Sequence, residues 1–167
     1  RWIEAGAPRT GSVADTSLLN DKTSSYVETF VGLEPPKAGE GIQMILNKFD
    51  VAPNFERELF QRKAVNNTED LYVNRVQIKM RQSSHHFILY SFRDMKSAYM
   101  PPFDQVRDIR NPDGTNNLLT LLSMSNHIFW AGAGSPTYDY TLPAGAALLL
   151  PANYSFDMNS HYVNKSS

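Results

Sequence analysis

The chain has 167 residues, with 16 basic and 17 acidic side chains and no cysteine. This length suits one domain with a sizeable core. The balanced charge, with no long run of Lys or Arg, argues against a nucleic-acid partner, and the lack of cysteine excludes disulfides, thiolate metal sites and c-type haem attachment. The longest apolar stretch, near residues 144–151, is much shorter than the roughly twenty residues of a transmembrane segment.

The first 25 residues differ in character from the rest of the chain. Residues 1–8, RWIEAGAP, have the pattern of a last helical turn that ends at Gly6 and is stopped by Pro8. Residues 9–25 are rich in Thr, Ser, Gly and Asp, which is typical of a linker. We therefore expect residues 1–25 to be the tail of a preceding domain plus a linker, and residues 26–167 to form the folded domain.

The remainder predicts short β-strands. Residues 71–80 alternate with period two, and residues 87–92, FILYSF, are apolar on both parities, as in a central strand buried between two layers. Residues 93–117 predict a long loop, and residues 118–124 fit either a helix or a strand. Other strand-like segments are residues 26–31, 40–49, 127–131, 138–142, 146–150 and 155–163. Together they predict an all-β, jelly-roll-like antiparallel β-sandwich with a long N-terminal arm.

Two of the four histidines, His85 and His86, are adjacent and lie directly before the apolar strand. Neighbours on a regular strand point to opposite faces, so both rings can reach one ion only at a strand end or a bulge. The polar residues Ser83 and Ser84 would place such an irregularity just before the pair. The sequence therefore permits His85 and His86 to share one metal ion.

A third imidazole comes from His161, in the strand-like segment SFDMNSHYVN. Asp157 and Asn159 share its parity, and either of them, or a backbone carbonyl, could hold the second ring nitrogen of a ligating histidine. Three neutral imidazoles suit copper, zinc or iron, and the residues alone do not choose among these metals. Histidines that only form hydrogen bonds are commoner than ligands, and we assign His127, which precedes the apolar IFWA, to that class.

Other polar and sulfur-bearing side chains have simpler interpretations. Glu56 and Glu58, in NFERELFQRK, are typical of alternating charges on a solvated strand or turn. Met80 and Met158 could supply thioether ligands, but both lie on apolar parities and predict core packing.

The segments SSHHFILYSF and LPAGAALLLPANYSFDMNSHYVN together resemble the copper type II, ascorbate-dependent monooxygenases, a group that includes the peptidylglycine α-hydroxylating and dopamine β-monooxygenases. Residues 55–87 are most similar to bacterial multidomain relatives, in which a cytochrome-like domain ending in WI-x-x-GAP comes first. The resemblance covers residues 26–167. It implies that His85, His86 and His161 bind one copper ion, that His127 has no functional role, and that the protein is periplasmic or extracellular.

In that family a second domain binds another copper through two histidines and a methionine, and this copper activates oxygen. Here the sequence stops six residues after His161. The resemblance therefore implies a truncated, electron-transfer copper domain that takes electrons from an ascorbate-type reductant, needs the missing second copper domain or a partner protein, and is not an active monooxygenase alone. The alternatives are a metal-free β-sandwich that serves as an extrinsic subunit of a larger assembly, and a zinc hydrolase with a three-histidine site.

Overall fold

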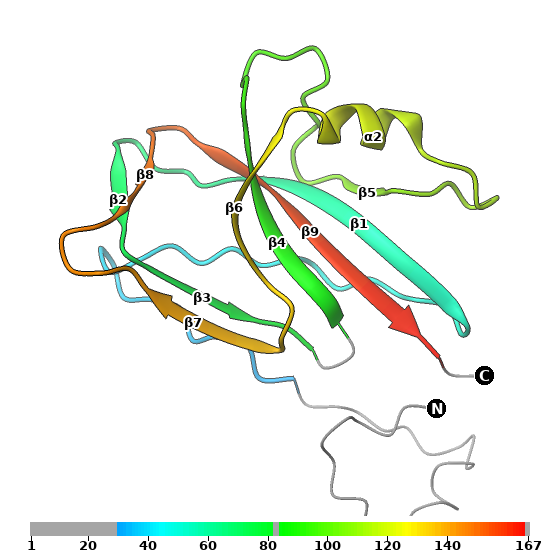
Figure 1. The fold of residues 1–167 in the computed structure, drawn as a ribbon, viewed down its shortest axis with the longest axis horizontal. Helices are drawn as coiled ribbons and strands as arrows, with labels where there is room; N and C mark the ends of the chain where they lie inside the picture. Colours follow the sequence, from blue (N-terminus) through cyan, green and yellow to red (C-terminus); the bar gives the residue numbers. More distant parts are fainter. Residues whose placement is uncertain (1–29, 82–83, 166–167) are drawn as a thin grey trace, which may run out of the picture.

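Five antiparallel strands form the main sheet of the computed structural model, which describes residues 30–81 and 84–165. Along the sheet their order is β5-β1-β9-β4-β6, so β4 and β9 lie side by side in its interior (Figure 1). The strands are β1 (Phe55–Ala64), β4 (Ser84–Phe92), β5 (Val106–Asp108), β6 (His127–Ala133) and β9 (Ser155–Asn164). The interior position of β4 confirms the prediction from FILYSF.

Four shorter strands form two further antiparallel pairs. Strand β2 (Leu71–Val73) pairs with β8 (Leu148–Leu150), and β3 (Arg75–Lys79) pairs with β7 (Thr137–Thr141). The first pair packs on the main sheet through Leu150 of β8 and Phe156 of β9, which are 2% and 3% exposed. This contact makes the fold a two-layered, all-β arrangement, as predicted. The finer jelly-roll connectivity stays a prediction.

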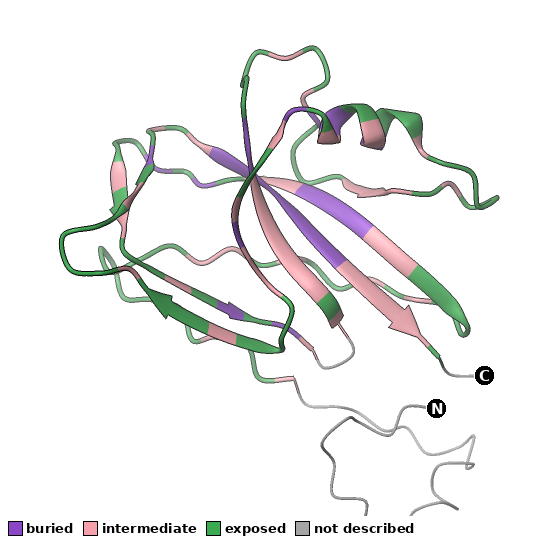
Figure 2. Ribbon diagram, viewed as in Figure 1, coloured by how far each residue is buried: buried purple, intermediate pink, exposed green. Residues whose placement is uncertain are grey.

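The alternation along β9 explains why its two faces differ. Phe156 and Met158 lie on the face toward the second layer, where Phe156 joins the core. Asp157, Asn159 and His161 have the opposite parity and lie on the other face. Figure 2 shows that the first part of β9 and the middle of β1 are buried, whereas the last part of β9 is half-buried. The polar residues of β9 thus run from a buried region to an accessible strand end.

That second face of the main sheet is partly covered by the connection between β4 and β6. The connection contains β5 and helix α2 (Leu118–Met124), whose first turn is capped by the side chain of Asn117. The loop predicted over residues 93–117 therefore holds one short strand, and residues 118–124 are helical. None of the helices among the described residues is long and apolar enough to cross a membrane.

The structure corrects two of the predicted strands. Residues 40–49 form no strand, because the run from Ile42 to Leu46 neither alternates regularly nor pairs with a neighbour, and Ile42 and Ile45 are exposed. Residues 71–80 form two strands instead of one, broken at Asn74. Before the break the odd-numbered residues Leu71 and Val73 face the core, and after it the even-numbered residues Ile78 and Met80 do so. Of the strand predicted over residues 26–31, residues 26–29 lie outside the described residues, and residues 30 and 31 form no strand. The predicted tail and linker over residues 1–25 also lie outside the described residues.

Candidate metal centre

A β-bulge at the start of β4 brings the adjacent histidines to one face. In the ladder between β4 and β9, Ser84 pairs with Tyr162 and His86 pairs with His161, so His85 is the extra residue. The Ser84 hydroxyl lies 3.2 Å from the His86 carbonyl oxygen and 3.4 Å from that of His161, and it can donate to either across the bulge. The predicted irregularity before the pair is therefore present, and it lets two neighbouring residues face the same point.

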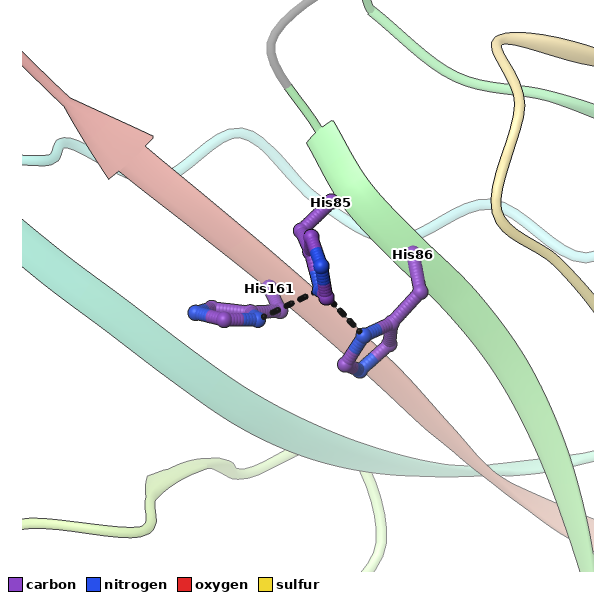
Figure 3. A group of neighbouring side chains, drawn as sticks. All are labelled: His85, His86 and His161. Carbon is purple, nitrogen blue, oxygen red and sulfur yellow. Dashed lines mark hydrogen bonds between the residues drawn. The ribbon is translucent and has the colours of Figure 1, made fainter.

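The rings of His85, His86 and His161, called the triad below, turn their Nδ1 atoms toward one another (Figure 3). His85 Nδ1 lies 3.2 Å from His86 Nδ1 and 3.2 Å from His161 Nδ1. One ligand atom from each residue lies within 4.8 Å of the others, so the triad could hold a metal ion. Two nitrogens bound tetrahedrally to one ion at about 2.0 Å would be about 3.3 Å apart. The two distances from His85 Nδ1 therefore fit coordination through Nδ1.

The partner of His86 fixes which of its nitrogens carries the proton. His86 Nε2 lies 2.7 Å from Asn159 Oδ1. The amide of Asn159 cannot be reversed, because its Nδ2 donates to the Leu59 carbonyl oxygen at 3.1 Å and to Glu58 Oε1 at 3.2 Å, and both of these oxygens only accept. His86 must therefore donate from Nε2, and in the neutral ring this leaves a lone pair on Nδ1. This confirms the predicted role of Asn159 as a partner of a second ring nitrogen.

His161 reaches the same state through a carboxylate. Its Nε2 lies 2.6 Å from Glu56 Oε1. When the glutamate is ionised, this oxygen accepts hydrogen bonds and cannot donate one. His161 therefore donates from Nε2, and in its neutral form it also presents a lone pair at Nδ1. The two neighbouring Nδ1 atoms both face His85 Nδ1, which in its neutral form has at most one proton and can satisfy only one of them. A cation at the centre would satisfy all three nitrogens, so the donor set fits a metal ion.

The surroundings of the triad place it at the end of the sheet, near solvent. The His85 ring is exposed, whereas the side chains of His86 and His161 are 21% and 13% exposed. Burial raises the pKa of the Tyr90 hydroxyl, and the Glu58 carboxylate raises it further, so this tyrosine stays a neutral phenol at neutral pH. The site thus combines two held imidazoles with one that is open to the surface.

Glu56 and Glu58 belong to this site, although the sequence suggested only a solvated charge pattern. Strand β1 pairs with β9 so that Glu58 is opposite His161, which puts both glutamates on the histidine-bearing face. Glu58 Oε1 lies 3.7 Å from His86 Nε2. The period-two spacing of residues 55–64 is the sequence signal that places Glu56 and Glu58 on one face of a strand. Only the pairing of β1 with β9 shows that this face carries the histidines.

His127 lies outside the triad, as expected. Its Nε2 is 2.9 Å from Asp157 Oδ2, and its ring stacks on Tyr90 with a centroid distance of 4.6 Å. Asp157 is fully buried and also accepts from Arg107. Of the two side chains predicted as partners of a ligating histidine, Asn159 therefore contacts the triad, whereas Asp157 holds His127. Met80 and Met158 are buried, which confirms their predicted place in the core.

A cleft of about 440 Å³ lies beside the triad. Glu56 and Glu58 line it, but none of the three histidines does. Arg57, which also lines it, donates from Nε to Asp108 at 2.6 Å, and this hydrogen bond raises the pKa of the guanidinium. A ligand in this cleft would therefore meet the carboxylates behind His86 and His161 and would not touch the Nδ1 atoms.

Comparison with known proteins adds no relative to these observations: no family model, no curated protein and no solved structure matches the chain. The description of the centre therefore depends on its own geometry. That geometry consists of the bulge at His85, the two fixed tautomers and the convergence of three Nδ1 atoms. These features identify a site that could hold a metal ion, and they leave the kind of metal open.

Proposed function

We propose that this chain is a copper-binding, electron-transfer domain in which His85, His86 and His161 hold one copper ion. The observation that carries the proposal is the pair of fixed tautomers, because Asn159 and Glu56 oblige two imidazoles to point lone pairs at the third. Such an arrangement is electrostatically satisfied by a cation and not by a hydrogen-bond network of neutral rings. The sequence resemblance to the ascorbate-dependent copper monooxygenases favours copper among the metals that imidazole binds.

The role of the domain would be to take up and release single electrons. When bound, copper supplies a centre that alternates between two oxidation states. His85 is exposed, so an ion that it binds lies close to the surface, where an ascorbate-type reductant and a second copper domain or partner protein could approach. The periplasmic or extracellular location belongs to the same proposal.

The cleft beside the triad offers no substrate site for a zinc hydrolase. A zinc hydrolase would need its substrate beside the metal-bound water. The cleft next to the triad is lined by Glu56 and Glu58 and by none of the histidines, so a substrate there would not reach the metal.

The test is to load the purified chain with Cu(II), remove the excess, and add ascorbate without oxygen. We expect about one copper per chain, as three convergent ligands imply, and loss of the Cu(II) electron paramagnetic resonance signal. We expect no hydroxylation of a glycine-extended peptide or of phenethylamine when oxygen is admitted. Hydroxylation by this chain alone would contradict an electron-transfer role. A chain that retains neither copper nor zinc would favour the metal-free subunit, and zinc binding without copper binding would favour the hydrolase.

A further inference from the structure

Two carboxylates lie behind the triad, on the side away from the converging Nδ1 atoms. Glu56 Oε1 accepts from His161 Nε2 at 2.6 Å. Glu58 Oε1 lies 3.7 Å from His86 Nε2 and accepts from Asn159, the amide that holds the same ring. Both side chains come from β1, whose pairing with β9 fixes their place relative to the triad.

The three histidines therefore differ in how close they lie to a negative charge. The His161 ring hydrogen-bonds directly to a carboxylate, whereas the His86 ring hydrogen-bonds to a neutral amide and lies 3.7 Å from the Glu58 carboxylate. A carboxylate that accepts from the far nitrogen of an imidazole makes the near nitrogen a stronger donor to a cation. His161 should thus be the strongest electron-pair donor to a metal ion among the three ligands.

The charges of the site also favour one ionic state. Three neutral imidazoles contribute no net charge, so Glu56 and Glu58 together balance a divalent ion and over-compensate a monovalent one. Such charges act at short range and are weakly screened where the groups are half-buried. Glu58 and His86 are 26% and 21% exposed, and His161 is 13% exposed, whereas Glu56 is 65% exposed but in direct contact with its histidine.

We propose that Glu56, with a smaller contribution from Glu58, gives this metal centre a preference for a divalent over a monovalent ion, and so lowers the reduction potential of a copper ion held by the triad. This inference rests on the proposed function. It makes Glu56 a positioning and tuning residue that acts through His161.

The test compares the affinities of the parent chain and its variants for Cu(II) and for Cu(I), measured by competition with chelators, together with the midpoint potential. Glu56→Gln keeps an oxygen that can accept from His161 but removes the charge. We expect it to weaken Cu(II) binding about tenfold, which is the low end of the effect for a residue that hydrogen-bonds to a metal ligand. Cu(I) binding should stay unchanged. A tenfold change in the ratio of the two affinities equals a rise of about 59 mV in the reduction potential. Zn(II), which has no redox chemistry, should lose a similar factor of affinity.

Further variants separate charge from position. Glu58→Gln should change the Cu(II) affinity in the same direction but less, because His86 hydrogen-bonds to Asn159 and not to this carboxylate. Glu56→Ala removes the acceptor as well as the charge, so it should weaken binding of both copper ions. Glu69→Gln is the control, since this exposed residue follows the far end of β1, about 20 Å along the strand from Glu58, and it should change neither affinity.

The outcomes distinguish this inference from the proposed function. If the parent chain binds no copper through the triad, the proposed function fails and this inference fails with it. If the parent binds copper and Glu56→Gln has the same potential as Glu69→Gln, the function stands and the inference is overturned. An equal loss of Cu(II) and Cu(I) affinity in Glu56→Gln would also overturn it, because it would show a structural role without charge preference.

Discussion

At the scale of single residues, the candidate metal centre depends on groups that can only accept a hydrogen bond. The Leu59 carbonyl and the Glu58 carboxylate orient the Asn159 amide, and that amide in turn decides the tautomer of His86. Asn159 is 1% exposed, so water does not replace these contacts. A ligand that is held in one tautomer and one rotamer pays less conformational entropy on binding a metal.

Replacement of Asn159 by alanine tests this relation. Without the amide, His86 Nε2 loses its acceptor, so the ring can turn and can also exchange tautomers. We expect Asn159→Ala to weaken Zn(II) or Cu(II) binding by about 10- to 100-fold, measured by competition with a chelator. Asn126→Ala is the matched control, because Asn126 is also a buried amide and donates to the Asp94 carbonyl oxygen, away from the triad. Unchanged metal affinity in Asn159→Ala would contradict the role given to the amide.

The second buried polar group, around Asp157, has a structural role instead. Its carboxylate accepts from Arg107 and from His127, and Asp157 is 0% exposed. Asp157→Asn removes the negative charge and leaves the guanidinium of Arg107 buried without a counter-ion. We expect the free energy of unfolding to fall by about 3–5 kcal/mol, measured by denaturant titration, with the metal affinity per folded chain unchanged. A loss below about 1 kcal/mol would show that the pair is effectively solvated.

At the scale of elements, the two short strand pairs are stabilised by different contacts. Strands β2 and β8 pack on the main sheet through apolar side chains. Strands β3 and β7 are linked to each other by an exposed salt bridge. Arg75 of β3 lies opposite Thr141 of β7, and its guanidinium donates to Asp139 from Nε at 2.8 Å and from an Nη at 2.6 Å. Both side chains are about half exposed, so this pair contributes register more than stability.

The same pair gives the β3–β7 ribbon a defined pH response. The hydrogen bond from Arg75 is the main cause that lowers the pKa of Asp139 below its ordinary value. A carboxyl group with a depressed pKa in the folded state stabilises the fold above the ordinary aspartate pKa, and this contribution disappears as the pH falls through the lowered value. Carboxyl-carbon NMR titration should show Asp139 titrating at lower pH than a model aspartate. Arg75→Gln should return it toward the ordinary value, and no change in that variant would contradict the assignment.

At the scale of the whole molecule, the sequence predicted the features that follow from alternation. The parity of residues 155–163 places Phe156 and Met158 on one face and Asp157, Asn159 and His161 on the other, as the structure has them. The apolar run after His86 predicted an interior strand for the same reason. A regular alternation is visible in one segment at a time, and it survives folding because each strand buries one of its faces.

Features that depend on pairing between distant segments could not be predicted. Glu56 and His161 are 105 positions apart, and only the register of β1 on β9 brings them together. The Asp157 partner of His127 was missed for the same reason. The break at Asn74 was missed because both parities of residues 71–80 carry apolar residues, and the choice between them changes with the layer that each half contacts. Residues 40–49 show that an apolar run is not sufficient for a strand without an available edge.

The most direct test of the central claim is a Cu(II) titration of the parent chain and of four single alanine variants, at His85, His86, His127 and His161. Electron paramagnetic resonance would count bound Cu(II) and show hyperfine splitting from the coordinating nitrogens. We expect the loss of any member of the triad to weaken Cu(II) binding by more than the roughly 10- to 100-fold typical of a residue that hydrogen-bonds to a metal ligand. His127→Ala should bind Cu(II) like the parent. Parent-like binding by His161→Ala, or loss of binding only in His127→Ala, would contradict the account.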